Sequence, residues 1–177
     1  SIPRPISIFR DYAKVGTRTQ YDKYAFSYLK AMIDKTGEIQ QLIDEKGTYK
    51  PDEAQKIAHN ALGGNLNSLY RSLKNLRDGN MLGAQLDAAE TIPNILKFIF
   101  AIEGRVRPYN KFLEWELENH PLKKLPLRSS EFIGKIQTIA HSADVETQKE
   151  ILSMIRALAL ENGHGDEIAD WEGYYFG

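Results

Sequence analysis

The fold is decided by residues 51–102, which read PDEAQKIAHNALGGNLNSLYRSLKNLRDGNMLGAQLDAAETIPNILKFIFAI. Apolar residues recur every three or four positions on both sides of a central DGN triplet, which is the spacing of one face of an α-helix. The stretch therefore predicts two helices, over residues 51–76 and about 81–102, joined by a tight turn at residues 78–80. Helices joined by so short a turn pack side by side in opposite directions.

Three residues inside these helices are unusual for a helix interior. Gly63 and Gly64 lie in the first helix, where each costs about 1 kcal/mol relative to alanine. We therefore expect a kink or a close contact with another element at this pair. Pro93 lies in the second helix and predicts a bend there.

The chain before residue 51 is predicted to hold an arm and one more helix. Pro3 and Pro5 remove backbone donors, so residues 1–19 are predicted to be an extended arm or an edge strand. From residue 20 to residue 43 apolar side chains return at helical spacing, which Gly37 could interrupt. Its tyrosines, including Tyr24 and Tyr28, are typical of a core or its rim rather than a stacking platform.

The chain after residue 102 continues the helical pattern. Residues 109–119 predict a short aromatic helix, and two longer helices follow. Ser129 or Ser130 is expected to cap the first of these, and Asp144 the second. The expected fold is all-α, an antiparallel bundle of about six helices forming one domain over residues 20–177, with the arm over residues 1–19.

Composition excludes several classes of protein. The 177 residues include no cysteine, which rules out disulfides and Cys-ligated zinc, and the four histidines show no zinc spacing. No apolar run reaches the roughly 20 residues of a membrane span, and no secretory signal is present, so we expect a cytoplasmic protein without a membrane partner. The net charge of −1 makes nucleic acid an unlikely partner.

The small net charge hides an uneven distribution of charged residues. Residues 144–177 carry eight acidic and two basic side chains, whereas the centre of the chain holds two basic clusters. The first cluster includes Arg71 and Lys74, which fall along one side of the first long helix and suit a phosphate or a carboxylate-bearing partner. The alternative is a solvated helix face paired with Asp78 or with glutamates elsewhere.

The second basic cluster lies at a junction between helices. Gly104 and Pro108 fix a tight connection there, and a polar ligand pocket uses this density of polar groups. The alternative is a surface corner in which Tyr109 and Trp115 pack as ordinary core. The polar groups at the junction are Glu103, Arg105, Arg107, Tyr109, Asn110 and Lys111.

Three blocks of sequence carry a resemblance to a known family: LYRSLKNLRDGN, LDAAETIP and FAIEGRVRPYNKFLEWEL, all between residues 65 and 122. They resemble the C-terminal helical domain of polymerase-β-superfamily nucleotidyltransferases, a group that includes aminoglycoside-type adenylyltransferases. RPYNK is the most specific part. In that family a catalytic domain carries a Gly-Ser turn and an Asp-x-Asp pair that holds Mg²⁺ against the nucleotide phosphates, and the helical domain helps to bind the acceptor.

The catalytic signatures of that family are missing from this chain. It contains no Gly-Ser dipeptide and no Asp-x-Asp, and the nearest sequence, Asp144-Val145-Glu146, is better explained as a helix cap. The resemblance therefore implies a substrate-binding or accessory domain without catalytic or metal-binding residues, for which ATP and Mg²⁺ are expected only with a catalytic domain in cis or in trans.

The resemblance also divides the candidate residues into two roles. A hydroxyl- or amine-bearing small-molecule acceptor would suit the carboxylates. Candidates for contacts with phosphate or with the other domain are Arg71, Lys74, Arg105, Arg107 and Lys111. Candidates for acceptor contacts are Glu90, Glu103, Tyr109, Asn110 and Trp115.

A different class of function stays open. The chain could be a stand-alone protein–protein module, similar to the helical HEPN partners of small nucleotidyltransferases, or could form a homodimer. Its amphipathic helices, acidic tail and apolar arm would supply the interface. The Arg-x4–6-His ribonuclease motif of many HEPN proteins is absent, so no nuclease activity is assigned.

Overall fold

The computed structural model describes residues 6–12 and 20–175. Over these residues the chain forms nine α-helices and one 3-10 turn, with no strand, which confirms the all-α prediction. Nine helices exceed the predicted six or so because several are short. No helix in this part of the chain combines the length and apolar character needed to span a bilayer.

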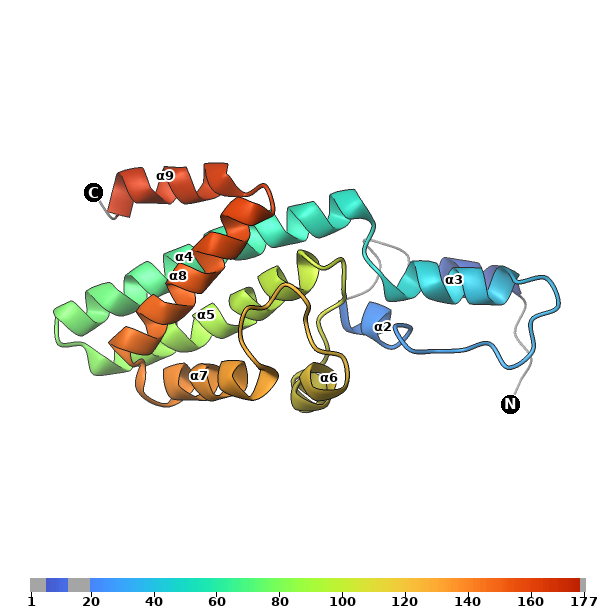
Figure 1. The fold of residues 1–177 in the computed structure, drawn as a ribbon, viewed down its shortest axis with the longest axis horizontal. Coiled ribbons are helices and arrows are strands. Elements are labelled where there is room, and N and C mark those ends of the chain that lie inside the picture. The colour runs from blue at the N-terminus through green and yellow to red at the C-terminus, as the bar shows by residue number, and fades with distance from the viewer. Residues whose placement is uncertain (1–5, 13–19, 176–177) are drawn as a thin grey trace.

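Two long antiparallel helices form the centre of the molecule, α4 (Pro51–Arg77) and α5 (Met81–Ala101) (Figure 1). Gly79 has a φ of +75° in the turn between them, and the side chain of Asn80 caps α5 by accepting a hydrogen bond from the Gly83 backbone. The Ser72 hydroxyl donates to the Ala84 carbonyl at 3.0 Å, so the two helices approach closely next to the turn. The predicted helix pair and its turn are confirmed.

The paired glycines of α4 lie at close contacts, as expected. A Cβ on Gly63 would lie 2.6 Å from Oε1 of Glu167, and one on Gly64 would lie 3.0 Å from the amide of Asn94. Helix α4 continues unbroken through both residues. The absence of a side chain at Gly63 therefore lets the last helix approach α4.

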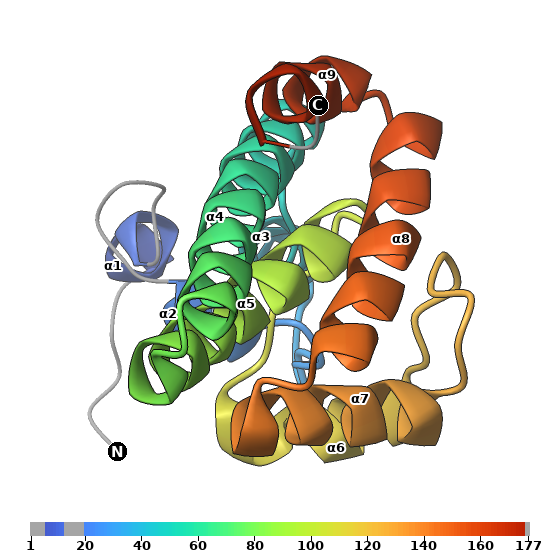
Figure 2. The same ribbon diagram turned by 90° about the vertical axis from the view of Figure 1, so that its left-hand side faces the viewer.

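Three more helices pack on this pair: α7 (Ser129–Ser142), α8 (Val145–Glu161) and α9 (Gly165–Tyr175) (Figure 2). Helix α6 (Leu113–Asn119) packs against α7. The 3-10 turn η1 (Asn110–Phe112) precedes α6, and the two together replace the single predicted helix over residues 109–119. Side chains from α4 to α9 form one main core, which includes Leu62, Phe98, Phe132 and Ile155. Helix α9 was not predicted from the sequence.

The N-terminal part forms a small lobe beyond the end of α4 and α5 (Figure 1). It contains α1 (Ile6–Asp11), α2 (Gln20–Tyr24) and α3 (Glu38–Gly47). The prediction of an extended arm is wrong over Ile6–Asp11, which is helical, and the rest of residues 1–19 apart from Tyr12 lies outside the described residues. Phe26 and Ile43 form a small core of the lobe, separate from the main one.

The helix predicted from residue 20 to residue 43 is wrong over residues 25–37, where the chain forms a turn and then an irregular loop. Two contacts explain the break. The Asp34 carboxylate accepts hydrogen bonds from the backbone N–H groups of Gly37 and Gln40 at 2.9 and 2.8 Å, which starts α3 anew. The apolar side chains of Met32 and Ile33 are 99% and 78% exposed, so no core holds them on a helix face.

The two predicted helix caps have different outcomes. Asp144 caps α8, because its side chain accepts from the Thr147 backbone N–H at 2.8 Å, and this bond holds the pKa of Asp144 below its ordinary value. The prediction for α7 is wrong, since Arg128 occupies the N-cap position without a side-chain bond. Ser129 instead donates its hydroxyl to the Leu117 carbonyl at 2.7 Å and ties α7 to α6.

Candidate functional site

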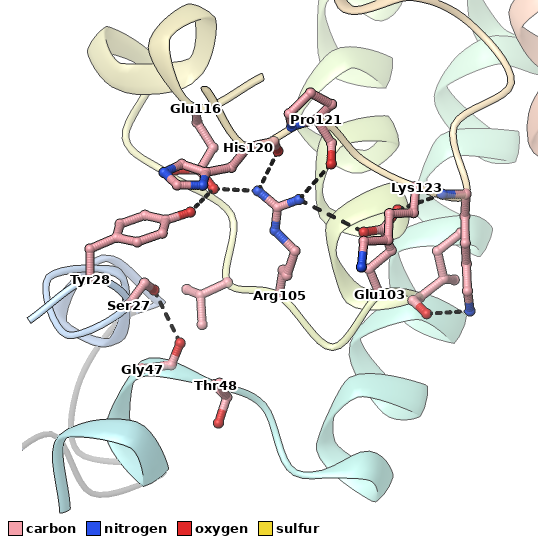
Figure 3. Close-up of a pocket in the computed structure, with 13 residues that line it drawn as sticks. Ser27, Tyr28, Gly47, Thr48, Glu103, Arg105, Glu116, His120, Pro121 and Lys123 are labelled. Atoms are coloured by element: carbon pink, nitrogen blue, oxygen red, sulfur yellow. Dashed lines mark hydrogen bonds and ion pairs between the residues drawn. The ribbon is translucent and has the colours of Figure 1, made fainter. Parts of the chain in front are cut away.

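A cleft of about 710 Å³ lies where the N-terminal lobe meets the main bundle (Figure 3). A volume of this size is typical of sites that bind small organic molecules. The lobe contributes one wall and the segment after α5 contributes the other. The lining residues are Ser27, Tyr28, Gly47, Thr48, Ile102, Glu103, Arg105, Val106, Glu116, His120, Pro121, Lys123 and Lys124.

The chain turns sharply after α5 and carries Arg105 into this cleft. Gly104 has a φ of +68°, in the left-handed region that favours glycine. The Arg105 backbone N–H donates to the Phe100 carbonyl at 3.0 Å, which closes the end of the helix. The Gly104 carbonyl accepts from the Tyr49 backbone N–H at 3.3 Å, so the segment is held against the lobe. This is the tight junction predicted from Gly104 and Pro108.

Arg105 lies at the centre of a hydrogen-bond network (Figure 3). Its Nη2 donates to Oε1 of Glu116 at 2.5 Å and to the His120 carbonyl at 2.8 Å. Its Nη1 donates to the Pro121 carbonyl at 3.3 Å, and the guanidinium lies over the Phe100 ring at 5.3 Å. The guanidinium is therefore fixed in one orientation and ties α6 and the loop after it to the end of α5.

Glu116 on α6 joins this network to the lobe. Its side chain is 2% exposed and accepts hydrogen bonds from the hydroxyls of Tyr24 at 2.9 Å and Tyr28 at 2.5 Å. Burial and the adjacent carboxylate raise the pKa of Tyr28 to about 12 and also raise the pKa of Tyr24. Both phenols therefore stay protonated at neutral pH and act as donors to the carboxylate.

Aromatic rings form one corner of the cleft. The Tyr28 and His120 rings stack with centroids 4.3 Å apart and an interplanar angle of 18°. Trp115 lies edge-on to both, with centroids 6.0 Å from Tyr28 and 5.4 Å from His120. Tyr28 and Trp115 are each nearly half exposed, so this corner offers apolar surface beside polar groups.

Glu103 and two lysines line the opposite side of the cleft. Oε1 of Glu103 accepts from the Lys124 backbone N–H at 2.7 Å, and Oε2 lies 3.8 Å from Nη1 of Arg105. The Lys124 ammonium donates to the Ile102 carbonyl at 2.7 Å and to the side chain of Asn162. Lys123 is exposed and lines the cleft next to Glu103 (Figure 3).

The predicted residues of the second basic cluster divide between the cleft and its surroundings. Glu103 and Arg105 line the cleft, and Trp115 borders it. The remaining four lie in the same junction without lining it. Arg107 is buried and donates to Asn110 at 2.5 Å; the Tyr109 ring packs edge-on against Tyr24 and Phe112; and the Lys111 ammonium lies 4.6 Å from the centre of the Phe112 ring.

The predicted residues of the first basic cluster lie elsewhere, along the end of the α4–α5 pair that carries the turn. Arg71 forms ion pairs with Asp87 and with Glu90, the latter at 2.5 Å. Arg71, a predicted phosphate contact, is therefore paired with Glu90, a predicted acceptor contact. This pairing agrees with the alternative of a solvated helix face paired with acidic residues. Lys74 is exposed on the same helix. A ligand role for these three residues stays a prediction.

Several residues that build the cleft are not predicted as site residues from the sequence, among them Tyr28, Glu116, His120 and Lys123. The tyrosine spacing of the lobe predicts core or rim positions, and Tyr28 lies at the rim of the cleft. Glu116 lies in the FAIEGRVRPYNKFLEWEL block but is not marked within it, and His120 and Lys123 lie outside every block. The role of all three depends on how α6 and the following loop fold back onto Arg105.

Neither a metal site nor a known relative identifies the cleft. Among the described residues, no group of three or more His, Asp or Glu side chains could hold a metal ion. No family model, curated protein or solved structure matches this chain. The features that bear on function are therefore the cleft and the residues that carry the sequence resemblance.

Proposed function

We propose that the chain is the helical substrate-binding or accessory module of a nucleotidyltransferase-type protein, and that the cleft around Arg105 is its ligand site. The observation that carries the proposal is the cleft itself. It has the volume of a small-molecule site, a fixed guanidinium at its centre and an aromatic corner at its edge.

The position of the most specific block of the resemblance supports the proposal. FAIEGRVRPYNKFLEWEL starts at the end of α5, runs past Arg105 and includes most of α6 with Glu116. The block therefore supplies both partners of the central ion pair of the cleft. The other two blocks lie in α4 with the turn after it and in α5, away from the cleft, so they do not contribute to this argument.

In this proposal the chemistry of nucleotidyl transfer belongs to a separate catalytic domain. That domain, in cis or in trans, would bind ATP and Mg²⁺ through its Gly-Ser turn and Asp-x-Asp pair. The present chain would hold a small-molecule acceptor or its phosphate group next to that centre. A hydrophobic corner with a few fixed polar groups is suited to orienting such a ligand.

Calorimetry tests the proposal. The chain is titrated with ATP–Mg²⁺ and with an aminoglycoside, alone and after mixing with a Gly-Ser/Asp-x-Asp catalytic domain encoded in the same or an adjacent reading frame. We expect binding of at least one ligand by the chain or by the mixture, and loss of that binding in the Arg105→Ala variant. Silence in both states, with a folded protein, would contradict the proposal.

A second candidate function, a protein–protein module that docks on a separate small nucleotidyltransferase, is favoured by the loop after α2. Leu29, Met32 and Ile33 are exposed there, and Met32 is almost fully accessible. Exposed apolar side chains grouped on one loop are typical of interaction sites.

Changing Met32→Asp and Ile33→Asp together separates the two candidates. A docking module would lose co-purification with its catalytic partner, whereas a ligand-binding module would keep its calorimetric signal. Ligand binding at the cleft is a separate readout, because neither side chain lines the cleft.

A further inference from the structure

Both carboxylates of the cleft are already engaged by the protein. Glu116 accepts from two tyrosines and from Arg105, and its side chain is almost fully buried. Glu103 accepts from the Lys124 backbone and lies beside Arg105. An amine ligand would have to displace these donors, and the displaced partners would lose their hydrogen bonds.

The cations of the cleft outnumber its carboxylates. Arg105, Lys123 and Lys124 face two carboxylates, and Lys124 is held by a backbone carbonyl and by Asn162. Within the described part of the chain, no hydrogen bond or ion pair holds the ammonium of Lys123. The Lys123 ammonium can therefore form an ion pair with a negative group of a ligand without losing a hydrogen bond or ion pair to the protein.

We propose that the cleft binds a phosphate-bearing small molecule rather than an amine, with Lys123 as the contact for its phosphate. This inference rests on the proposed function and names the ligand class of the same site. The phosphate lies against the Lys123 ammonium. The organic part of the ligand lies toward the wall of Val106 and the Tyr28–His120 stack.

The dimensions and charge of the site favour an organic phosphate over a bare ion. A cavity of about 710 Å³ is far larger than one phosphate group, and apolar side chains line part of it. A phosphate carries up to two negative charges at neutral pH, so it gains more from one uncompensated cation than a neutral hydroxyl does. The cleft has more cations than carboxylates, whereas a site for an amine-rich acceptor would need more carboxylates than cations.

Calorimetry with three probes in metal-free buffer tests the inference: ADP, adenosine and spermidine. We expect ADP to bind at least tenfold more tightly than adenosine, and spermidine not to compete with it. Lys123→Ala weakens ADP binding about tenfold, since one charge-assisted hydrogen bond contributes about that factor. Lys149→Ala is the matched control, because it also removes an exposed lysine but lies on α8, outside the cleft.

Each contrary outcome identifies what is wrong. Spermidine binding without ADP binding overturns the ligand class and leaves the proposed function standing. Equal ADP affinities for the wild type and Lys123→Ala, with unchanged circular dichroism, overturn the assignment of Lys123. Equal affinities for ADP and adenosine overturn the phosphate contact. Failure of all three probes, and of the mixture with a catalytic domain, overturns the proposed function as well.

Discussion

Glu116 is the residue on which the cleft depends most. It joins α6 to Arg105 and to two tyrosines of the N-terminal lobe, so one carboxylate connects both walls. It lies in a block singled out from the sequence, but no spacing rule identified it, because its partners lie 11, 88 and 92 positions away. Partners so distant in sequence become neighbours only through the tertiary fold.

Replacing Glu116→Gln removes the charge and keeps the size of the side chain. We expect the free energy of unfolding to fall by about 2 kcal/mol, less than for a fully buried pair because Arg105 is a quarter exposed. Urea denaturation measures this change. Glu114→Gln, at an exposed site of the same helix, is the control and should change stability by less than about 0.5 kcal/mol. Equal effects of the two variants would contradict the role given to Glu116.

The buried His164 is expected to make the free energy of unfolding depend on pH. Its ring is buried against Phe98, and burial, together with the nearby His59, lowers the pKa of His164 below its ordinary value of 6.5 despite opposing effects of Asp166 and Glu167. Below pH 6.5 the unfolded chain therefore takes up a proton more readily than the folded one, and stability falls as the pH falls.

The measurement is the free energy of unfolding at pH 7.5 and pH 5.5. We expect His164→Phe to reduce the loss of stability between these two values, whereas His141→Gln, at an exposed site, leaves it unchanged. An unaltered pH dependence in His164→Phe would show that this side chain does not contribute to it.

At the scale of elements, the sequence predicts the helices, turns and caps that depend on the local spacing of apolar and capping residues. The α4–α5 pair, its turn and the Asp144 cap follow from apolar periodicity and from residues with a strong preference for one position. The predictions that failed concern segments where tertiary contacts override periodicity. Residues 25–37 have helical spacing but no core to pack against, and Ser129 bonds to α6 instead of capping its own helix.

Two helical glycines should respond oppositely to alanine. A Cβ on Gly47, at the end of α3, would lie 2.9 Å from backbone atoms of Phe26, so Gly47→Ala should destabilise the protein by about 1–3 kcal/mol. A Cβ on Gly134, in α7, would meet no atom within 4 Å, so Gly134→Ala should stabilise by up to about 1 kcal/mol. Thermal unfolding of both variants checks the signs, and a neutral Gly47→Ala would contradict the close packing of α3 against Phe26.

At the scale of the whole molecule, the cleft arises where two separately packed parts meet. The lobe has its own small core, and the main bundle has another. One wall is predictable from the sequence, because Gly104 and the charged residues around it mark a junction. The other wall is not, since the contribution of Tyr28 and Thr48 depends on how the lobe docks. For the same reason the sequence predicts a common role for Arg71, Lys74 and Arg105, although the two basic clusters lie at different ends of α5.

Ligand binding at the cleft is tested most directly by ¹H–¹⁵N NMR while ADP is titrated into the full chain. We expect backbone signals around the cleft to shift first and to saturate, while signals around Arg71 stay in place. The largest shifts are expected for Tyr28, Arg105, His120 and Lys123. Saturable shifts centred on Arg71 and Lys74 instead, with the cleft unaffected, would contradict ligand binding there.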